Sequence, residues 1–316
     1  MTALRWLRWL PWVALALLPL VLHSNFILTI FIFSFILGMA AVSFNLVFGF
    51  TGQLSMFHAA AFGIGAYTTY LSVSRWHLSF WVALLPAILL TVAISLVVGA
   101  ICFKFKLKAF YFAVVTLAFS ELARLVVLNW NDVTGGTLGL MVLDKPVLWL
   151  PGAGAFKIDG TVAWYYFGLL GLILTVAVCA IVLRSWIGRC FAAIRLNEDL
   201  AQTLGIDIFR YKLLSFTIAN VLAALAGSLY AFYTGYIEPS YLSIAQSLDI
   251  IAMVLLGGRT SIVGPIVGAF VLTGLPHVIE LSAEIRAMLY GLILILTILL
   301  MPNGVVGTLV GRRRAA

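Results

Sequence analysis

The sequence predicts an all-α, polytopic membrane protein with about ten transmembrane or partly re-entrant helices. Of its 316 residues, 64% are hydrophobic and only 9% are charged, and the mean hydropathy is +1.15. A helix needs about 20 mostly apolar residues to cross a bilayer, and apolar windows of that length recur along the chain. They lack the alternation over about 10 residues that marks the strands of an outer-membrane barrel. A soluble domain and a barrel are therefore both excluded.

The expected helices follow one another closely along the chain. The first, after Arg5 and Arg8, resembles a signal peptide, but no small-x-small cleavage site follows it, and we expect a retained helix. The eighth is short enough to be re-entrant, which leaves the exact number of crossings open. The expected spans are 10–23, 26–48, 54–74, 79–103, 109–128, 163–183, 213–233, 241–257, 262–280 and 286–302.

The placement of Lys and Arg orients these spans, because cytoplasmic loops of membrane proteins are enriched in both residues. If the N-terminus is inside, ten crossings put both termini and fourteen of the 19 basic residues in the cytoplasm. The net charge of +8 then reflects loops next to lipid. Nucleic acid is excluded as a partner on this basis.

One polar segment, 184–212, interrupts the apolar chain and holds eight charged residues. Its apolar residues recur with helical spacing, which predicts an amphipathic helix with one apolar side: Phe191, Ile194, Leu200 and Leu204. We expect such a helix in the cytoplasm to contact a partner protein. We treat the whole chain, 1–316, as one domain that carries this segment.

The longest non-cytoplasmic connection, 129–162, is rich in Gly and Pro. It is too short for a catalytic domain, and a docking surface, an external gate and a simple connector all remain open. Two other glycine-rich stretches, 49–65 and 257–268, enter the membrane from cytoplasmic turns. Transporters often contain repeated interrupted helices of this kind, and whether these two form a repeat stays open.

No known constellation for catalysis or nucleotide binding is present. The chain lacks GxxxxGK[ST], HExxH, CxxC and GxSxG motifs, and Cys102, Cys179 and Cys190 are isolated. We therefore expect a transport subunit that is not an enzyme and holds no cofactor or metal.

Polar residues within the expected spans are the candidate transport residues. Gln53, Ser55 and His58 open the third span, where Ser55 and His58 are spaced to share one helix face. An unpaired polar group is costly inside a membrane. This cluster therefore either lines a translocation pathway, or His58 ties neighbouring helices together.

Charged residues within the spans are the candidates for a gate or a buried charge. Glu121 and Arg124 are spaced to neutralise each other on one helix face, as a gate, a latch or a structural pair. Asp249, in the eighth span, is a carboxylate of the kind a proton-coupled carrier uses.

Four stretches together resemble the inner-membrane permeases of branched-chain amino acid ABC transporters, of the LivM-like type. They occur in the expected order over most of the chain: 44–71 (FNLVFGFTGQLSMFHAAAFGIGAYTTYL), 116–140 (TLAFSELARLVVLNWNDVTGGTLGL), 188–216 (GRCFAAIRLNEDLAQTLGIDIFRYKLLSF) and 255–269 (LLGGRTSIVGPIVGA). Gln53, Ser55 and His58 match the family pattern GQLSxxHAAxFGIGAY. This chain departs from it at Met56 and Phe57, where Leu-Gly is common.

The resemblance implies a bacterial inner-membrane importer subunit. Its expected partners are a second permease subunit, two cytoplasmic ATPases that bind ATP and Mg²⁺, and a periplasmic substrate-binding protein. Segment 189–205 resembles the cytoplasmic coupling loop, whose helix inserts into a groove of the ATPase. The expected ATPase-coupling residues are Arg189, Arg195, Glu198, Asp199, Ala201 and Gly205.

The substrate remains open at this stage. A branched-chain or other hydrophobic amino acid is the leading expectation, and urea, short amides and aromatic acids are transported by very similar permeases. An ion-coupled secondary transporter and a channel or structural subunit are the competing classes. The former would need several intramembrane carboxylates, and the latter would not need the amphipathic cytoplasmic helix.

Overall fold

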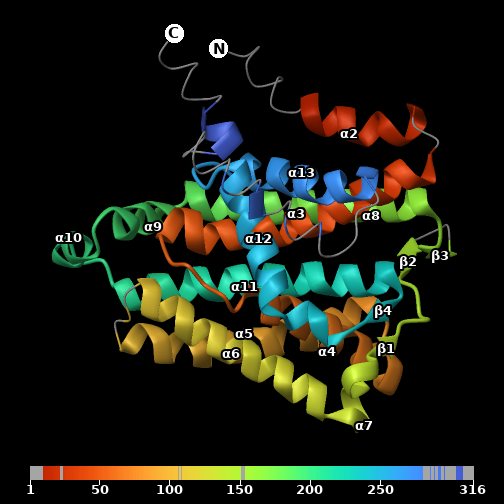
Figure 1. Cartoon of the computed structure of the whole chain (residues 1–316), viewed down its shortest axis with the longest axis horizontal. Coiled ribbons are helices and arrows are strands. Elements are labelled where there is room, and N and C mark those ends of the chain that lie inside the picture. The colour runs from red at the N-terminus through yellow and green to blue at the C-terminus, as the bar shows by residue number, and fades with distance from the viewer. Residues whose placement is uncertain are drawn as a thin grey trace.

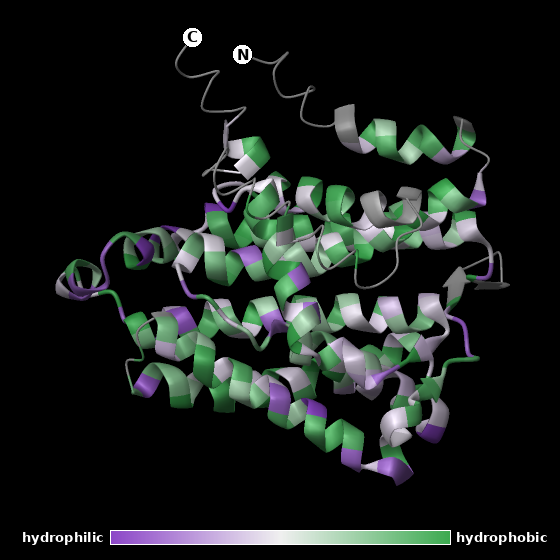
Figure 2. Ribbon diagram, in the orientation of Figure 1, coloured by the Kyte–Doolittle hydropathy of each residue, from purple (hydrophilic) through white to green (hydrophobic). Residues whose placement is uncertain are grey.

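The computed structural model describes residues 10–21, 24–105, 107, 109–150, 154–279 and 304–308, together with residues 285, 288, 291, 292 and 295. Its long helices lie side by side, roughly along one direction (Figure 1). Hydrophobic residues cover these helices, whereas hydrophilic ones gather at the two ends of the bundle (Figure 2). The predicted helical membrane class is confirmed.

Within the described residues, five helices are long and apolar enough to cross a membrane: α3 (Asn25–Thr51), α5 (Phe80–Lys104), α6 (Ala109–Asn129), α8 (Thr161–Arg184) and α11 (Ile208–Thr234). The bundle also holds α2 (Leu10–Val21), α4 (His58–Trp76), α12 (Ile244–Gly257) and α13 (Val263–Ile279). Helices are thus present at each of the first nine predicted spans. The tenth, 286–302, lies almost entirely outside the described residues.

Helices α3 and α11 form the centre of the bundle. Helix α3 packs against α8, α11 and α13, and α11 packs against α4 and α5 as well. Large side chains on both, such as Phe35, Phe44 and Phe216, are fully buried. Helices α5 and α8 instead expose apolar residues such as Leu89 and Ile181, as expected for helices at the lipid boundary.

Small residues bring α4 and α11 into close contact. A Cβ at Gly65 would lie 2.1 Å from the Ala224 carbonyl oxygen, and one at Gly227 would lie 1.9 Å from that of Phe62. The Ser228 hydroxyl donates a hydrogen bond to the Gly65 carbonyl (3.1 Å). Small residues allow such close helix packing in membranes, so α4 is held firmly against α11.

The third predicted span is interrupted at its start. The sequence analysis placed Gln53 and Ser55 at the opening of a helix over 54–74, but α4 begins only at His58, and residues 52–57 are not helical. Gly52, with φ +76°, ends α3, and the Ser55 hydroxyl accepts a hydrogen bond from the Phe57 N–H. Such local side-chain bonds compete with helix formation, so Ser55 and His58 do not share a helix face.

A second segment that is not α-helical separates α11 from α12. Strand β4 (Tyr236–Ile237) and the 3₁₀ turn η2 (Pro239–Leu242) precede α12, which Ser243 caps by accepting a hydrogen bond from the Gln246 N–H. The predicted span 241–257 is therefore shortened to a helix of 14 residues. We refer below to residues 52–57 as the first break and residues 235–243 as the second break.

The connection 129–162 lies at one end of the bundle (Figure 1). It contains α7 (Asn131–Thr134), η1 (Gly136–Leu138) and three short strands: β1 (Leu140–Met141), β2 (Val147–Leu150) and β3 (Gly154–Lys157). Strand β1 pairs antiparallel with β4, with Leu140 opposite Ile237, and β2 pairs with β3. The connection therefore packs against the second break.

Candidate functional site

Helices α9 (Trp186–Leu196) and α10 (Glu198–Thr203) project at the opposite end of the bundle, which we call the α10 end (Figure 1). The single amphipathic helix expected in segment 184–212 is wrong, because Asn197 separates two helices. Asn197 is extended, and its side chain caps α10 by accepting a hydrogen bond from the Leu200 N–H (3.0 Å). Asn at such a cap satisfies a backbone donor that the helix leaves unpaired.

The interruption at Asn197 changes which apolar residues are buried. Phe191 and Ile194 of α9 are buried in the bundle, whereas Leu200 and Leu204 are 60% and 72% exposed. Leu196 is exposed beside them. The α10 end therefore presents an apolar surface next to the acidic residues Glu198 and Asp199. An exposed apolar patch rimmed by polar groups is typical of a protein-binding surface.

Two of the predicted coupling residues shape α10. Ala201 is buried, so α10 packs against the rest of the protein through this residue. Gly205 has φ +81° and ends the helical segment, and a Cβ there would meet no atom within 4 Å. Its role in the structure is the left-handed turn rather than close packing.

Glu198 joins α10 to two distant parts of the chain. Its Oε1 lies 2.6 Å from Lys212 Nζ, in the second turn of α11, and accepts a hydrogen bond from Gln53 Nε2 (3.2 Å) in the first break. The Lys212 side chain is only 7% exposed, whereas that of Glu198 is 46% exposed. The carboxylate thus neutralises a nearly buried ammonium and holds the first break at the same time.

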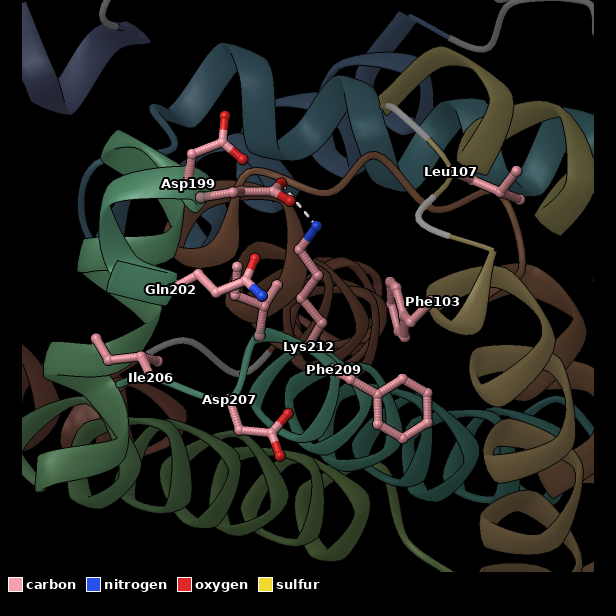
Figure 3. Close-up of a pocket in the computed structure, with 10 residues that line it drawn as sticks. Phe103, Leu107, Asp199, Gln202, Ile206, Asp207, Phe209 and Lys212 are labelled. Carbon is pink, nitrogen blue, oxygen red and sulfur yellow. Dashed lines mark ion pairs between the residues drawn. The ribbon is translucent and has the colours of Figure 1, made fainter. Parts of the chain in front are cut away.

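An open cavity of about 610 Å³ lies beside this ion pair. In Figure 3, Lys212 points toward the carboxylate, and Asp199, Gln202 and Asp207 surround the hollow. The lining comes from the end of α5, the α5–α6 connection, α10, the α10–α11 connection and the start of α11: Phe103, Leu107, Glu198, Asp199, Gln202, Ile206, Asp207, Ile208, Phe209 and Lys212.

Arg195 makes a second connection between this end and the first break. Its guanidinium donates to the Gly49 carbonyl, and its stem lies next to Gly52. Burial, with a smaller contribution from Arg259, lowers the pKa of Arg195. A Cβ at Gly49 would lie 2.4 Å from the Arg259 carbonyl oxygen, so the two glycine-rich stretches meet here. Arg189 is exposed and instead lies over the Trp186 ring.

Helices α6 and α12 hold the inner part of the first break. The Met56 N–H donates to Thr116 Oγ1 of α6 (3.0 Å), and the Met56 carbonyl accepts from Ser247 Oγ of α12 (3.0 Å). Ser120, one turn after Thr116, donates to the Leu242 carbonyl of the second break (3.4 Å). Helix α6 therefore bonds to both interruptions.

His58 lies behind the first break and is fully buried. Its Nε2 is 2.8 Å from Ser43 Oγ and 3.2 Å from the Ala40 carbonyl oxygen of α3, and Asn220 of α11 approaches the ring. Asn220 also donates to Ser95 of α5 (3.1 Å). Four helices are thus linked by polar groups near the middle of α11. A role of Gln53, Ser55 or His58 in contacting substrate stays a prediction.

The charged residues predicted as a gate lie on α6 and α12. Arg124 Nε donates to both carboxylate oxygens of Glu121 (3.0 and 2.9 Å), and their side chains are 30% and 31% exposed. Asp249, on α12, is half-buried. Their role as gate or latch stays a prediction.

Residues 26–299 match the family described as the branched-chain amino acid transport system permease component. The chain belongs to this permease family. The resemblance seen in its motifs is thus confirmed. Among related permeases, LivM of the high-affinity branched-chain amino acid transport systems of Salmonella typhimurium and of Escherichia coli K12 are each 30% identical over 278 residues. LivH of Salmonella typhimurium is 24% identical over 292 residues.

These alignments cover different shares of the permeases. The LivM alignments include 82% of this chain but only 65% of each relative, whereas the LivH alignment includes 85% and 91%. The chain therefore spans less than two-thirds of the length of the LivM relatives. No solved structure matches it.

Several residues that organise this permease were missed by sequence reasoning. Lys212 lies within the polar segment, but only its burial against Glu198 sets it apart from the other basic residues. Thr116 and Ser247 are hydroxyl residues within apolar helices, and no local pattern marks them. Their partners are distant in sequence, so only the tertiary structure reveals them.

Proposed function

We propose that this chain is a transmembrane permease subunit of an ATP-driven importer for branched-chain or other hydrophobic amino acids. Family membership and the names of its LivM and LivH relatives support this substrate class. ATP hydrolysis resides in separate cytoplasmic ATPase subunits, and a second permease subunit and a periplasmic binding protein complete the importer. The chain itself carries out no chemical reaction.

The observation that carries the mechanism is the contact of Glu198 with Gln53. Glu198 begins α10, and the exposed Leu200 of this helix and Leu204 just after it form the docking surface for an ATPase. Gln53 lies in the first break, which also contains Met56 and leads directly to α4. Closure of the ATPases displaces α10, and this displacement passes through Glu198 to the break. Rigid elements that shift about a hinge transmit motion in this way.

The orientation follows from the charges at the two ends. Segment 184–212 carries five basic residues at the α10 end, so this end faces the cytoplasm. In the proposed topology both termini are cytoplasmic as well, and the membrane is the inner membrane of a bacterial cell. The connection 129–162 then faces the periplasm, where the binding protein docks. Permeases for urea, short amides or aromatic acids, and an ion-coupled carrier, remain the alternatives to be tested.

The test is uptake by the complete importer in proteoliposomes. We expect leucine uptake that requires ATP on the α10 side and the binding protein on the other side. Glu198→Lys places a cation beside Lys212 and Gln53 and should abolish this uptake. The matched surface variant Arg210→Gln, whose side chain is 83% exposed, should behave as wild type. Uptake driven by an ion gradient without ATP would overturn the proposal.

A further inference from the structure

An ion pair interrupts the apolar surface of α6. Glu121 and Arg124 lie in the second half of this membrane-spanning helix, and about a third of each side chain is exposed. The neighbouring Leu122 and Leu125 are exposed and apolar. A charged group is costly against hydrocarbon, so charged residues within membrane helices face protein or a water-filled path. The exposed part of this pair therefore faces water or a polar group rather than lipid.

The pair also lies at about the same depth in the membrane as the first break and the second break. Thr116 holds the first break and Ser120 holds the second, and Glu121 follows Ser120 directly. The interrupted helices α4 and α12 both begin in this region. In transporters, discontinuous helices of this kind form the substrate site near the middle of the membrane. The depth of the Glu121–Arg124 pair in the membrane and its charges are independent observations, and both indicate a substrate site at this position.

The chemistry of the pair matches one class of substrate. In the absence of substrate, Arg124 and Glu121 neutralise each other. An amino acid brings an ammonium for the Glu121 carboxylate and a carboxylate for the Arg124 guanidinium. One ion pair is then exchanged for two, and no charge is left without a partner. Urea and neutral amides offer no such exchange.

Exposed apolar residues on α6 and on a helix that contacts it suit an aliphatic side chain. Leu122 and Leu125 are exposed on α6, and Leu248 is exposed on α12, which contacts α6. We infer that Glu121 and Arg124 bind the ammonium and carboxylate groups of a zwitterionic amino acid as it crosses the membrane. This inference rests on the proposed import function and assigns the substrate site within it.

The experiment compares a neutral and a reversed pair in the complete reconstituted importer. Glu121→Gln/Arg124→Gln removes both charges and leaves no lone ion in the membrane. We expect assembly with the ATPases and ATP hydrolysis to persist, while leucine uptake falls more than about tenfold, because both charged groups of the substrate lose their charged partners. Uptake equal to wild type would overturn the inference.

The reversed pair separates substrate binding from a structural role. Glu121→Arg/Arg124→Glu keeps an intrahelical ion pair but exchanges the positions of the two charges. A purely structural pair would give normal uptake in this variant, which would contradict our inference. We expect uptake to stay low, because a reversed head group directs the aliphatic side chain away from the apolar residues.

A labelling experiment decides the matter even if the neutral variant fails to assemble. Leu128→Cys, one turn beyond Arg124, is made in an otherwise wild-type importer; Cys102, Cys179 and Cys190 are buried. We expect a charged thiol reagent to modify it, and leucine delivered by the binding protein to slow that reaction. Leu89→Cys on α5 serves as the lipid-facing control. Absence of protection during active uptake overturns the inference alone, whereas absence of wild-type uptake overturns the proposed function.

Discussion

Gln53 and Glu198 are 145 positions apart in the chain, yet Gln53 Nε2 donates to Glu198 Oε1 at 3.2 Å. This hydrogen bond joins α10 to the first break. Helix α10 projects from the bundle, whereas the first break extends into the bundle. Lys212 anchors the same carboxylate from α11. A displacement of α10 therefore changes the position of the break unless the bond is broken.

Removing this bond should uncouple ATP hydrolysis from transport. Gln53→Leu keeps the approximate size of the side chain but loses a hydrogen bond to a charged group, which is worth about 1.5–3 kcal/mol. We expect leucine uptake to fall about tenfold in proteoliposomes, while ATPase activity stays within about twofold of wild type. The control is Asn129→Leu, which replaces an exposed polar residue at the last position of α6. A parallel loss of both activities would count against coupling through Gln53.

The Glu198–Lys212 pair should stabilise the α10 end in a way that a double-mutant cycle detects. Glu198→Ala leaves Lys212 charged and nearly buried, and breaking a buried pair costs about 3–5 kcal/mol. Because Glu198 is almost half exposed, we expect a reduced loss of about 1–2 kcal/mol. Adding Lys212→Met should recover part of it, as measured by the thermal unfolding midpoint of the purified permease. Strictly additive effects would show that the pair contributes no stability.

Gly205 should tolerate only residues that adopt a left-handed backbone. A Cβ there has free space, so any cost of Gly205→Ala comes from φ +81° alone and should be about 1–2 kcal/mol. Asn adopts this conformation more readily, so Gly205→Asn should retain more ATPase binding in co-purification. Gly160→Ala, also in open space but at negative φ, should have no effect. Equal binding by all three variants would contradict the turn requirement.

The exposed leucines of α10 should govern binding of the ATPase. Leu200→Glu introduces a charge on the apolar surface, and we expect at least a tenfold loss of affinity, since burying an unpaired charge at an interface costs several kcal/mol. Co-purification and titration with the isolated ATPase measure it. Leu138→Glu, at an 82% exposed position at the opposite end against 60% for Leu200, is the control. If both variants bind normally, the ATPase contacts another surface.

The predictions from sequence succeeded where apolar runs were long and uninterrupted. Helices α5, α6 and α8 agree with their predicted spans within about two residues, because length and hydropathy alone decide whether a segment forms a membrane helix. The start of the third span was wrong, because the backbone of Met56 bonds to Thr116 and Ser247 instead of to a helix. The single helix expected in the polar segment was wrong for a local reason, the cap at Asn197.

The sequence by itself therefore determined that this chain is an apolar helical bundle, which segment projects from it, and to which permease family it belongs. These properties depend on composition, periodicity and motif order, which are local. Only the tertiary structure decided that Gln53, Glu198 and Lys212 meet, and that α6 bonds to both breaks beside the Glu121–Arg124 pair. Those contacts join residues far apart in the chain, and the packing of α3, α4 and α11 brings them together.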